Sequence, residues 1–452
     1  MSRELNRRKF LEISSLGSLS TAMIGLTQSG CAGPMRRLTT QADMAFAVPP
    51  MKTVRIGYVG VGVMGTAHVK NLLRIEGAEI KAVCDIIPDK VFNAQNLTEE
   101  AGQKRPTAYN RGPTDYIRMC NEEDLDLVYT ATPWELHVPV CVAAMKAGKH
   151  AATEVPAAVT VDECWQLVDT AEKYKKHCVI MENCCYDRSE MTVLNMVRNG
   201  LFGEILHAEC GYLHDLREVK FSGEGEGLWR IAHSISSDGN LYPTHGLGPV
   251  AQYMNINRGD KFDYIVSMSS NSRGLNLYAE ELFGKDDSRA KQKYALGDIN
   301  VSMIKTANGL TITLVHDTST PRPYDRINLV QGTKGIFRGY PDRIHVENRS
   351  PDHEWESLDS YMAEYEHPLW KAVGDAAKGA GHGGMDYLED YRLIKCLREG
   401  LPTDMNVYDA ASWSVVTELS KRSVANKSRP IDFPDFTRGK WKTAKPLGIV
   451  GG

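Results

Sequence analysis

The sequence predicts two folded parts in series: an α/β part with a doubly wound parallel sheet, then an α+β part with a mainly antiparallel sheet. Three observations support this division. Apolar runs of strand length alternate with helical patterns up to about residue 185, and from about residue 204 the runs follow one another as strands. The chain has 452 residues, enough for two or three domains of ordinary size.

Composition and charge are those of an ordinary globular protein. Hydrophobic residues make up 42% and charged residues 24%, and the formal net charge is −4. Without a basic excess, the chain has no electrostatic reason to bind nucleic acid. The ten cysteines form no CxxC pair and have no zinc-type spacing. We therefore expect no disulfide framework, no metal site and no nucleic-acid partner.

Residues 1–31 are typical of an export signal. A basic start at residues 7–11 (RRKFL) precedes a short, weakly apolar stretch and a run of small residues ending at Cys31. The paired arginines are typical of the twin-arginine route. Cys31 is a candidate for lipid attachment, although Gln28 stands where such sites carry an apolar residue, and residues 32–50 follow as a tether. We expect an exported protein, periplasmic or held as a lipoprotein on an envelope membrane; a basic, disordered start on a cytosolic protein is the alternative.

The first strand and helix of the α/β part are joined by a glycine-rich turn. Residues 54–59 are a buried-strand pattern, residues 66–74 a helical one, and Gly60, Gly62 and Gly65 form a G-x-G-x-x-G between them. Such glycines permit a tight turn, close approach of a pyrophosphate, and close contact of helix and strand. The next strand, 79–84, ends at Asp85, where a carboxylate accepts hydrogen bonds from adenosine ribose hydroxyls and repels a 2′-phosphate. Residues 51–185 are therefore predicted to be a Rossmann domain that binds NAD; a glycine turn with an unrelated surface aspartate is the alternative.

The alternation continues with strands at 125–131, 150–154 and 178–183 and helices at 135–147 and 161–175. The carboxyl ends of parallel strands meet at one edge of the sheet, where ligands bind. We therefore expect the residues that follow these strands to line a site, namely Trp134, His137, Glu154, Val155, Glu182 and Asn183.

The second part, residues 186–452, is predicted to be a substrate domain. Asn308 and Gly309 form a good hairpin turn between two of its strands. Two amphipathic segments, 387–398 and 408–425, are predicted helices that pack back on the body. The expected strands of an antiparallel sheet are 205–213, 264–269, 300–306, 310–316, 326–331 and 343–347.

Several stretches resemble known families. The glycine-rich turn, Thr132-Pro133 with His137, and residues 147–156 (AGKHAATEVP) resemble the glucose–fructose oxidoreductase/inositol dehydrogenase superfamily, which pairs a dinucleotide domain with a large open antiparallel sheet. That superfamily commonly has lysine where Val155 stands, and valine cannot donate a proton as that lysine does. From about residue 50 to the C-terminus the chain further resembles glycoside hydrolase family 109, the NAD-dependent α-N-acetylgalactosaminidases, at residues 134–137 (WELH), 181–186 (MENCCY), 239–246 (GNLYPTHG) and 255–260 (NINRGD).

This resemblance implies a glycosidase that removes terminal α-linked N-acetylgalactosamine with overall retention. NAD⁺ takes hydride from carbon 3 of the sugar, the ketone acidifies the proton on carbon 2, and the group on carbon 1 leaves by elimination; water addition and reduction complete the cycle. His245 is the expected base, because histidine works near neutral pH. Tyr242 would meet it on one helix face, and Tyr324 matches an active-site tyrosine of the family.

The resemblance also implies two sets of contacts. Those to NAD are Gly60, Gly62, Met64, Gly65, Asp85, Trp134, Glu135, Leu136, His137, Glu154, Val155 and Asn183. Those to the sugar are Tyr212, Arg230, Tyr242, Pro243, Thr244, His245 and Tyr324.

Other functions stay open at this point. A net sugar oxidoreductase of the same superfamily is disfavoured by Val155. A non-catalytic sugar-binding envelope protein is disfavoured by the intact glycine turn, Asp85 and the pair of Tyr242 and His245. His245 as a buried structural histidine and Tyr324 as a half-buried aromatic are the simpler interpretations of those residues. The sequence leaves open a homo-oligomeric assembly and the natural glycan.

Overall fold

The computed structural model describes residue 44, residues 46–446 and residues 448–449. The predicted export signal, Cys31 and most of the predicted tether lie outside the described residues. Where it is described, the end of that tether lies against the body: Met44 accepts a hydrogen bond from Asn406 through its carbonyl oxygen, and Val48 packs on the core.

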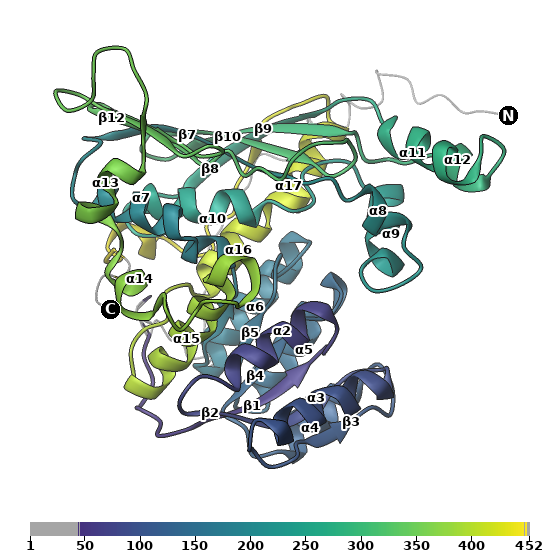
Figure 1. Cartoon of the computed structure of the whole chain (residues 1–452). Coiled ribbons are helices and arrows are strands. Elements are labelled where there is room, and N and C mark those ends of the chain that lie inside the picture. Colours follow the sequence, from purple (N-terminus) through teal and green to yellow (C-terminus); the bar gives the residue numbers. More distant parts are fainter. Residues whose placement is uncertain (1–43, 45, 447, 450–452) are drawn as a thin grey trace, which may run out of the picture. The chain divides into compact units, whose positions relative to one another are not determined.

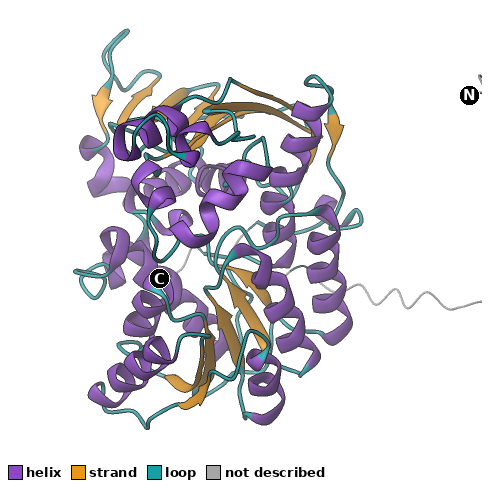
Figure 2. Ribbon diagram, turned by 90° about the vertical axis from the view of Figure 1, so that its right-hand side faces the viewer, coloured by secondary structure: helices purple, strands orange, loops and turns teal. Residues whose placement is uncertain are grey.

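The first domain is a six-stranded sheet in the order β3-β2-β1-β4-β5-β6, with every neighbouring pair parallel. The order changes direction between β1 and β4, which places a ligand crevice beyond their carboxyl ends. Figure 2 shows helices on both faces of this sheet. The strands are β1 (Val54–Val59), β2 (Ala78–Cys84), β3 (Thr107–Tyr109), β4 (Leu127–Thr130), β5 (His150–Thr153) and β6 (Cys178–Ile180). The helices are α2 (Val63–Leu72), α3 (Pro88–Glu100), α4 (Asp115–Glu122), α5 (Trp134–Lys146) and α6 (Val161–Tyr174).

The second domain is built on a nine-stranded sheet in the order β14-β13-β12-β11-β7-β10-β9-β8-β15. Neighbouring strands are antiparallel except β7 and β10, which are parallel, so the prediction of a mainly antiparallel sheet is confirmed. The hairpin at Asn308 and Gly309 joins β9 to β10, with Gly309 at a φ of +94°. The strands are β7 (Ile205–Leu213), β8 (Phe262–Ser269), β9 (Ile299–Thr306), β10 (Thr311–Asp317), β11 (Leu329–Gly332), β12 (Gly335–Arg338), β13 (Arg343–Val346), β14 (Glu356–Ser357) and β15 (Ile431–Asp432).

Several predicted elements differ in the structure. The helix predicted at 66–74 is α2, which begins at Val63, and the strand predicted at 178–183 ends at Ile180. The strand predicted at 326–331 begins only at Leu329, because Ile327 and Asn328 have positive φ angles (65° and 41°) that an extended strand does not allow. The helix predicted at 408–425 is two helices, α16 (Val407–Ser414) and α17 (Val416–Ala425), which meet at Val415. The break lets α16 pack on α6 of the first domain while α17 packs on β8.

Helices cover one face of the second sheet and link the two domains. In Figure 1, α7 and α10 lie between that sheet and the first domain. Helix α15 packs against α2, so the prediction that the C-terminal helices pack back on the body is confirmed. The remaining helices are α7 (Arg188–Arg198), α8 (Arg217–Phe221), α9 (Gly227–Ser236), α10 (Thr244–Tyr253), α11 (Gly274–Phe283), α12 (Ser288–Lys291), α13 (Asp359–Tyr365), α14 (Pro368–Val373) and α15 (Met385–Glu399), with 3₁₀ turns η1 (Asn183–Tyr186), η2 (Gly381–Gly384) and η3 (Lys440–Lys442).

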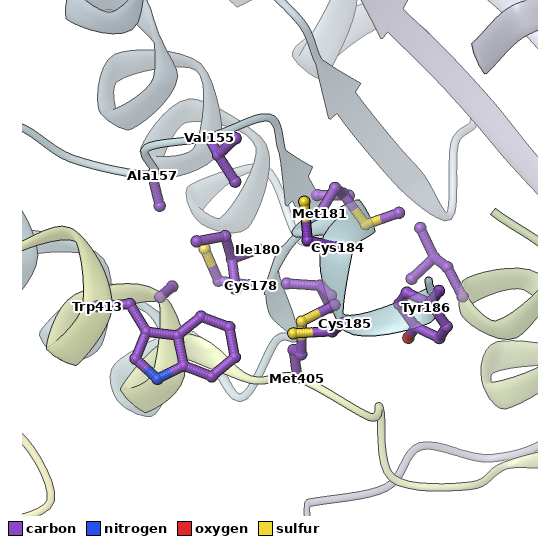
Figure 3. Packing of buried hydrophobic residues seen from close by; sticks show 14 of the residues in the cluster. Val155, Ala157, Cys178, Ile180, Met181, Cys184, Cys185, Tyr186, Met405 and Trp413 are labelled. Carbon is purple, nitrogen blue, oxygen red and sulfur yellow. The ribbon is translucent and has the colours of Figure 1, made fainter. Parts of the chain in front are cut away.

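One hydrophobic core runs through both domains. Figure 3 shows the part of this core where the two domains meet. There, Ile180 of β6, Cys185 of η1 and Trp413 of α16 pack together. Nine cysteines fall in the described part of the chain, and all are buried and unpaired, as small core residues. Over the same residues, no helix is both long enough and apolar enough to cross a membrane.

Candidate active site

The glycine-rich turn forms a cradle beside the N-terminus of α2. Gly60 has a φ of +83°, and a Cβ there would lie 2.7 Å from the Ala131 carbonyl oxygen. A Cβ at Gly65 would overlap the Gly60 carbonyl oxygen, whereas one at Gly62 would meet only Lys90 Nζ, at 3.8 Å. Gly60 and Gly65 therefore serve the turn and its packing. Gly62 opens on free space at a helix N-terminus, which fits a pyrophosphate.

Asp85, at the end of β2, is fixed beside this cradle. Its Oδ2 accepts a hydrogen bond from the Val61 N–H at 3.0 Å, and its Oδ1 accepts one from the Ile87 N–H at 2.9 Å. A carboxylate has about four acceptor positions, so others remain for ribose hydroxyls. The residues present therefore fit a dinucleotide without a 2′-phosphate.

The ends of β4, β5 and β6 place the other predicted cofactor residues along the same edge. His137 is buried, and its ring nitrogens lie 2.8 Å from the carbonyl oxygens of Thr132 and Pro156. Its ring nitrogens thus face these two loops rather than the crevice. Glu154 is half-buried, Asn183 and Val155 are buried, Leu136 and Met64 are half-buried, and Glu135 is exposed at the start of α5.

A buried histidine that the sequence did not single out holds Glu154. His68 of α2 lies 2.7 Å from Glu154 Oε1 through Nε2 and 2.9 Å from Asp390 Oδ2 through Nδ1. Burial opposes a charge on this ring, but Asp390 and Glu154 raise the pKa of His68 well above its usual value. The cationic ring therefore ties α15 to the cofactor edge. No local sequence pattern predicts this role of His68, because its partners lie far away in the chain.

Four predicted sugar residues gather below the second sheet. The ring of Tyr212, at the end of β7, lies 4.6 Å from that of Tyr242, 5.3 Å from that of His245 and 6.1 Å from that of Tyr324. Tyr242 and His245 are 4.9 Å apart and perpendicular. The sequence predicted both on one helix face, but α10 begins at Thr244 and Tyr242 lies just before it, next to the N-cap Pro243.

His245 is oriented by a buried carboxylate. Its Nδ1 lies 2.7 Å from Glu182 Oε1, and Glu182 is fully buried between the two domains. Burial disfavours the ionised form of Glu182, yet His245 and nearby hydrogen bonds keep the pKa of that carboxyl below its usual value. An ionised carboxylate only accepts, so Nδ1 carries the hydrogen and the Nε2 lone pair is left as a base.

Cys184 completes a group with Glu182 and His245 whose ligand atoms lie within 4.8 Å of one another. Burial raises the pKa of the Cys184 thiol well above its usual value, and Glu182 Oε1 already accepts from His245 and from the Cys184 N–H. The hydrogen-bonded pair of Glu182 and His245 therefore explains this group.

Arg230 lies where the cofactor edge meets the sugar residues. Its guanidinium lies 5.3 Å from the ring of Trp134 of the first domain, 4.9 Å from that of Trp229 and 5.2 Å from that of Tyr242. Trp134 also contacts the Tyr242 ring, at 5.7 Å. The predicted NAD and sugar residues thus line adjoining surfaces, with Pro243 and Thr244 buried behind them.

Two more histidines lie at this site. His214 Nδ1 lies 2.9 Å from the Tyr212 hydroxyl, and the His214 ring is 5.0 Å from that of Tyr324. Burial lowers the pKa of His214, and Arg230 adds to the effect. The turn at residues 381–384 carries His382, whose side chain is 50% exposed and whose Nδ1 lies 2.8 Å from Asp386 Oδ2.

His382 is tied to the cofactor edge through Asp386. The Asp386 carboxylate also accepts a hydrogen bond from Asn183 Nδ2 at 2.7 Å. The bond from Asp386 raises the pKa of His382, which favours the protonated ring. His382 was not among the predicted site residues; it lies among three glycines, and its partner Asp386 follows four residues later in the first turn of α15.

The fold and this site define an NAD-binding protein of dehydrogenase architecture, and the comparisons agree. Residues 54–182 match the family model for the oxidoreductase family, NAD-binding Rossmann fold. A levoglucosan dehydrogenase in complex with NADH and L-sorbose is similar in structure, with a TM-score of 0.66 at 21% identity, covering 85% of this chain and 100% of that one. Residues 186–443 match the model for the glycosyl hydrolase 109 C-terminal domain. The chain belongs to glycosyl hydrolase family 109.

Full-length relatives support that assignment. A glycosyl hydrolase family 109 protein of Shewanella pealeana is 49% identical, covering 99% of this chain and all of that one. A Shewanella oneidensis protein named alpha-N-acetylgalactosaminidase is 46% identical, with 99% of both chains covered.

Proposed function

We propose that this protein is an NAD-dependent α-N-acetylgalactosaminidase that removes the terminal sugar with overall retention. The observation that carries the proposal is the position of His245. Its Nδ1 is committed to Glu182, and its ring lies against both Tyr212 and Tyr242, at 5.3 and 4.9 Å. The 46%-identical relative of that name supports the substrate. Against a net sugar oxidoreductase, the common lysine position holds Val155, which is 3% exposed and has no proton to give.

When bound, NAD would supply the reversible removal of hydride from carbon 3, with the hydroxyl proton released to solvent, and the resulting ketone makes the proton on carbon 2 acidic. The chain's own part is to hold the sugar and move protons. His245 Nε2 accepts the carbon 2 proton, exchanges it with solvent and later returns a proton to carbon 2, while the ionised Glu182 stabilises the charged imidazole. The rings of Tyr212 and Tyr242 offer apolar faces to the sugar, and Arg230 offers hydrogen-bond donors to its hydroxyls.

His382 is suited to serve the group that leaves carbon 1. A general acid must be protonated and reachable, and this half-exposed ring has a pKa raised by Asp386. The same ring, once deprotonated, can activate the water that adds in the second half of the cycle. Its link through Asp386 to Asn183 keeps this acid in register with the cofactor edge.

The test is turnover of p-nitrophenyl α-N-acetylgalactosaminide by the purified protein without added cofactor, run in D₂O. We expect nitrophenol and N-acetylgalactosamine in equal amounts, deuterium at carbon 2 of the product, and no accumulation of NADH. Accumulating NADH with an oxidised sugar as product would instead establish the oxidoreductase. Cleavage without deuterium at carbon 2 would rule out the elimination route.

A further inference from the structure

Arg326 is a buried arginine in direct contact with Tyr324. Its side chain lies in the turn that precedes β11 and is 3% exposed. Nη1 donates to the Tyr324 hydroxyl oxygen at 3.1 Å, Nε donates to Glu190 Oε1 at 2.9 Å, and Nη2 lies 3.1 Å from Asp187 Oδ2. The carboxylates of Asp187, the N-cap residue of α7, and of Glu190 in α7 therefore fix the guanidinium, and the guanidinium fixes the tyrosine.

This contact decides the direction of the Tyr324 hydrogen bond. A guanidinium has only donors, so toward Arg326 the phenol oxygen can only accept. Burial raises the pKa of Tyr324 far above its usual value despite the neighbouring cation, so the phenol keeps its hydrogen. That hydrogen is left for an acceptor other than Arg326. The ring itself stands among Tyr212 and His214, the residues of the sugar site.

The backbone immediately after Arg326 has an unfavourable conformation. Ile327 has a φ of +65°, which is unfavourable for a β-branched residue. Asp325 holds this turn: its carboxylate accepts from the Ile327 N–H at 2.6 Å, and its backbone exchanges two hydrogen bonds with Leu213, next to Tyr212 on β7. Strain of this kind persists where the surroundings enforce it, often at functional sites.

We propose that Arg326 is a positioning residue that makes Tyr324 an obligate hydrogen-bond donor to the oxygen on carbon 3 of the sugar. The inference rests on the proposed function. When His245 Nε2 takes the proton from carbon 2, the electron pair of that C–H bond moves onto the carbon 3 oxygen, which becomes negative. When the bond from carbon 1 to the leaving group breaks, that pair forms the double bond between carbons 1 and 2, and the leaving group departs with a proton from His382.

The developing charge on the carbon 3 oxygen needs a prearranged donor, and such donors act most strongly in sites from which water is excluded. His245 and Tyr324 both lie near the Tyr212 ring, with ring centroids 5.3 and 6.1 Å from it. The base and the donor therefore face one sugar from different elements, and Arg326 polarises the phenol without touching the substrate.

The test is a double-mutant cycle with Tyr324→Phe, Arg326→Lys and the double variant, measured on a substrate with and without deuterium at carbon 2. We expect kcat to fall about 10²–10³-fold in Tyr324→Phe and about 10–100-fold in Arg326→Lys, with little change in KM. In the Tyr324→Phe background, the Arg326 change should cost nothing more. The isotope effect on kcat should rise in each single variant, because proton removal becomes the slower step.

The matched control is Arg392→Lys, since Arg392 is also buried and pairs with Asp404 through two bonds of 2.7 Å without contacting Tyr324. It should lose comparable thermal stability but keep the wild-type kcat and isotope effect. Multiplicative losses in the double variant, an unchanged isotope effect, or a loss in Arg326→Lys no larger than in the control would overturn the inference. Failure of the wild type to cleave the substrate would instead refute the proposed function.

Discussion

Alanine at Gly65 of the glycine-rich turn is predicted to lower the stability of the fold, whereas alanine at Gly62 is predicted to weaken NAD binding without lowering stability. At Gly65, a Cβ would overlap the Gly60 carbonyl oxygen and lie 3.1 Å from Tyr58 Cε1, so α2 must move away from β1. Overpacking of this kind costs up to about 3 kcal/mol, and alanine's helix preference returns about 1 kcal/mol. We therefore expect the free energy of unfolding to fall by about 2 kcal/mol, and cofactor binding to weaken with it.

At Gly62 the added methyl group would meet nothing within 3.8 Å. We expect the free energy of unfolding to stay within about 0.5 kcal/mol of the wild type. The methyl group would, however, occupy the space that the pyrophosphate needs and push it from the backbone N–H groups, a loss of about 1–3 kcal/mol. NAD should then bind about tenfold or more weakly.

The assay is urea unfolding of cofactor-free protein, because bound NAD would stabilise each variant by mass action, together with NAD titration by fluorescence. Gly223→Ala is the control, since a Cβ there has nothing within 4 Å and the residue lies away from the turn. The reasoning is wrong if Gly62→Ala binds NAD like the wild type, or if Gly65→Ala is as stable as Gly62→Ala.

Four further predictions concern the acid, its pKa, the cofactor and export. His382→Asn should lower kcat about 10²–10⁴-fold for an alkyl glycoside but much less for a nitrophenyl one, whose leaving group needs no proton; equal losses would exclude the acid role. Asp386 raises the pKa of His382, so in Asp386→Asn the acid should lose its proton at a lower pH. The alkaline limb of the pH profile of kcat should then shift to lower pH, and an unshifted limb would contradict this role of Asp386. Denatured wild type should release about one NAD per chain and Asp85→Ala less, as measured by absorbance after filtration, since the cradle loses the acceptor at 3.0 Å from Val61 N. Replacing Arg7 and Arg8 by lysine should leave active, NAD-loaded protein in the cytoplasm on fractionation; export as before would mean a signal of another type.

Local patterns in the sequence were enough to predict the order of most elements and the glycine-rich turn. Hydrophobic residues recur with different periods in strands and in helices, so neighbouring residues are enough to predict these elements. Gly60 and Gly65 both act within one turn, which a local motif can also predict. The short edge strand β3 was not predicted, because only Tyr109 of its three residues is buried. The residues of the sugar site were found through resemblance to a family, since no spacing relates Tyr212 to Tyr324.

What only the tertiary structure decided is which partner each functional group has. Glu182 and His245 are 63 residues apart, and His68 and Asp390 are 322 apart. The periodicity of hydrophobic residues predicts that a residue is buried, but it does not predict which charged group lies beside it. Those pairings set which nitrogen of His245 is free, and they join the buried His68 to Asp390. They depend on distances of about 3 Å across packed elements, and only the folding of both domains onto α15 and α7 brings those atoms together.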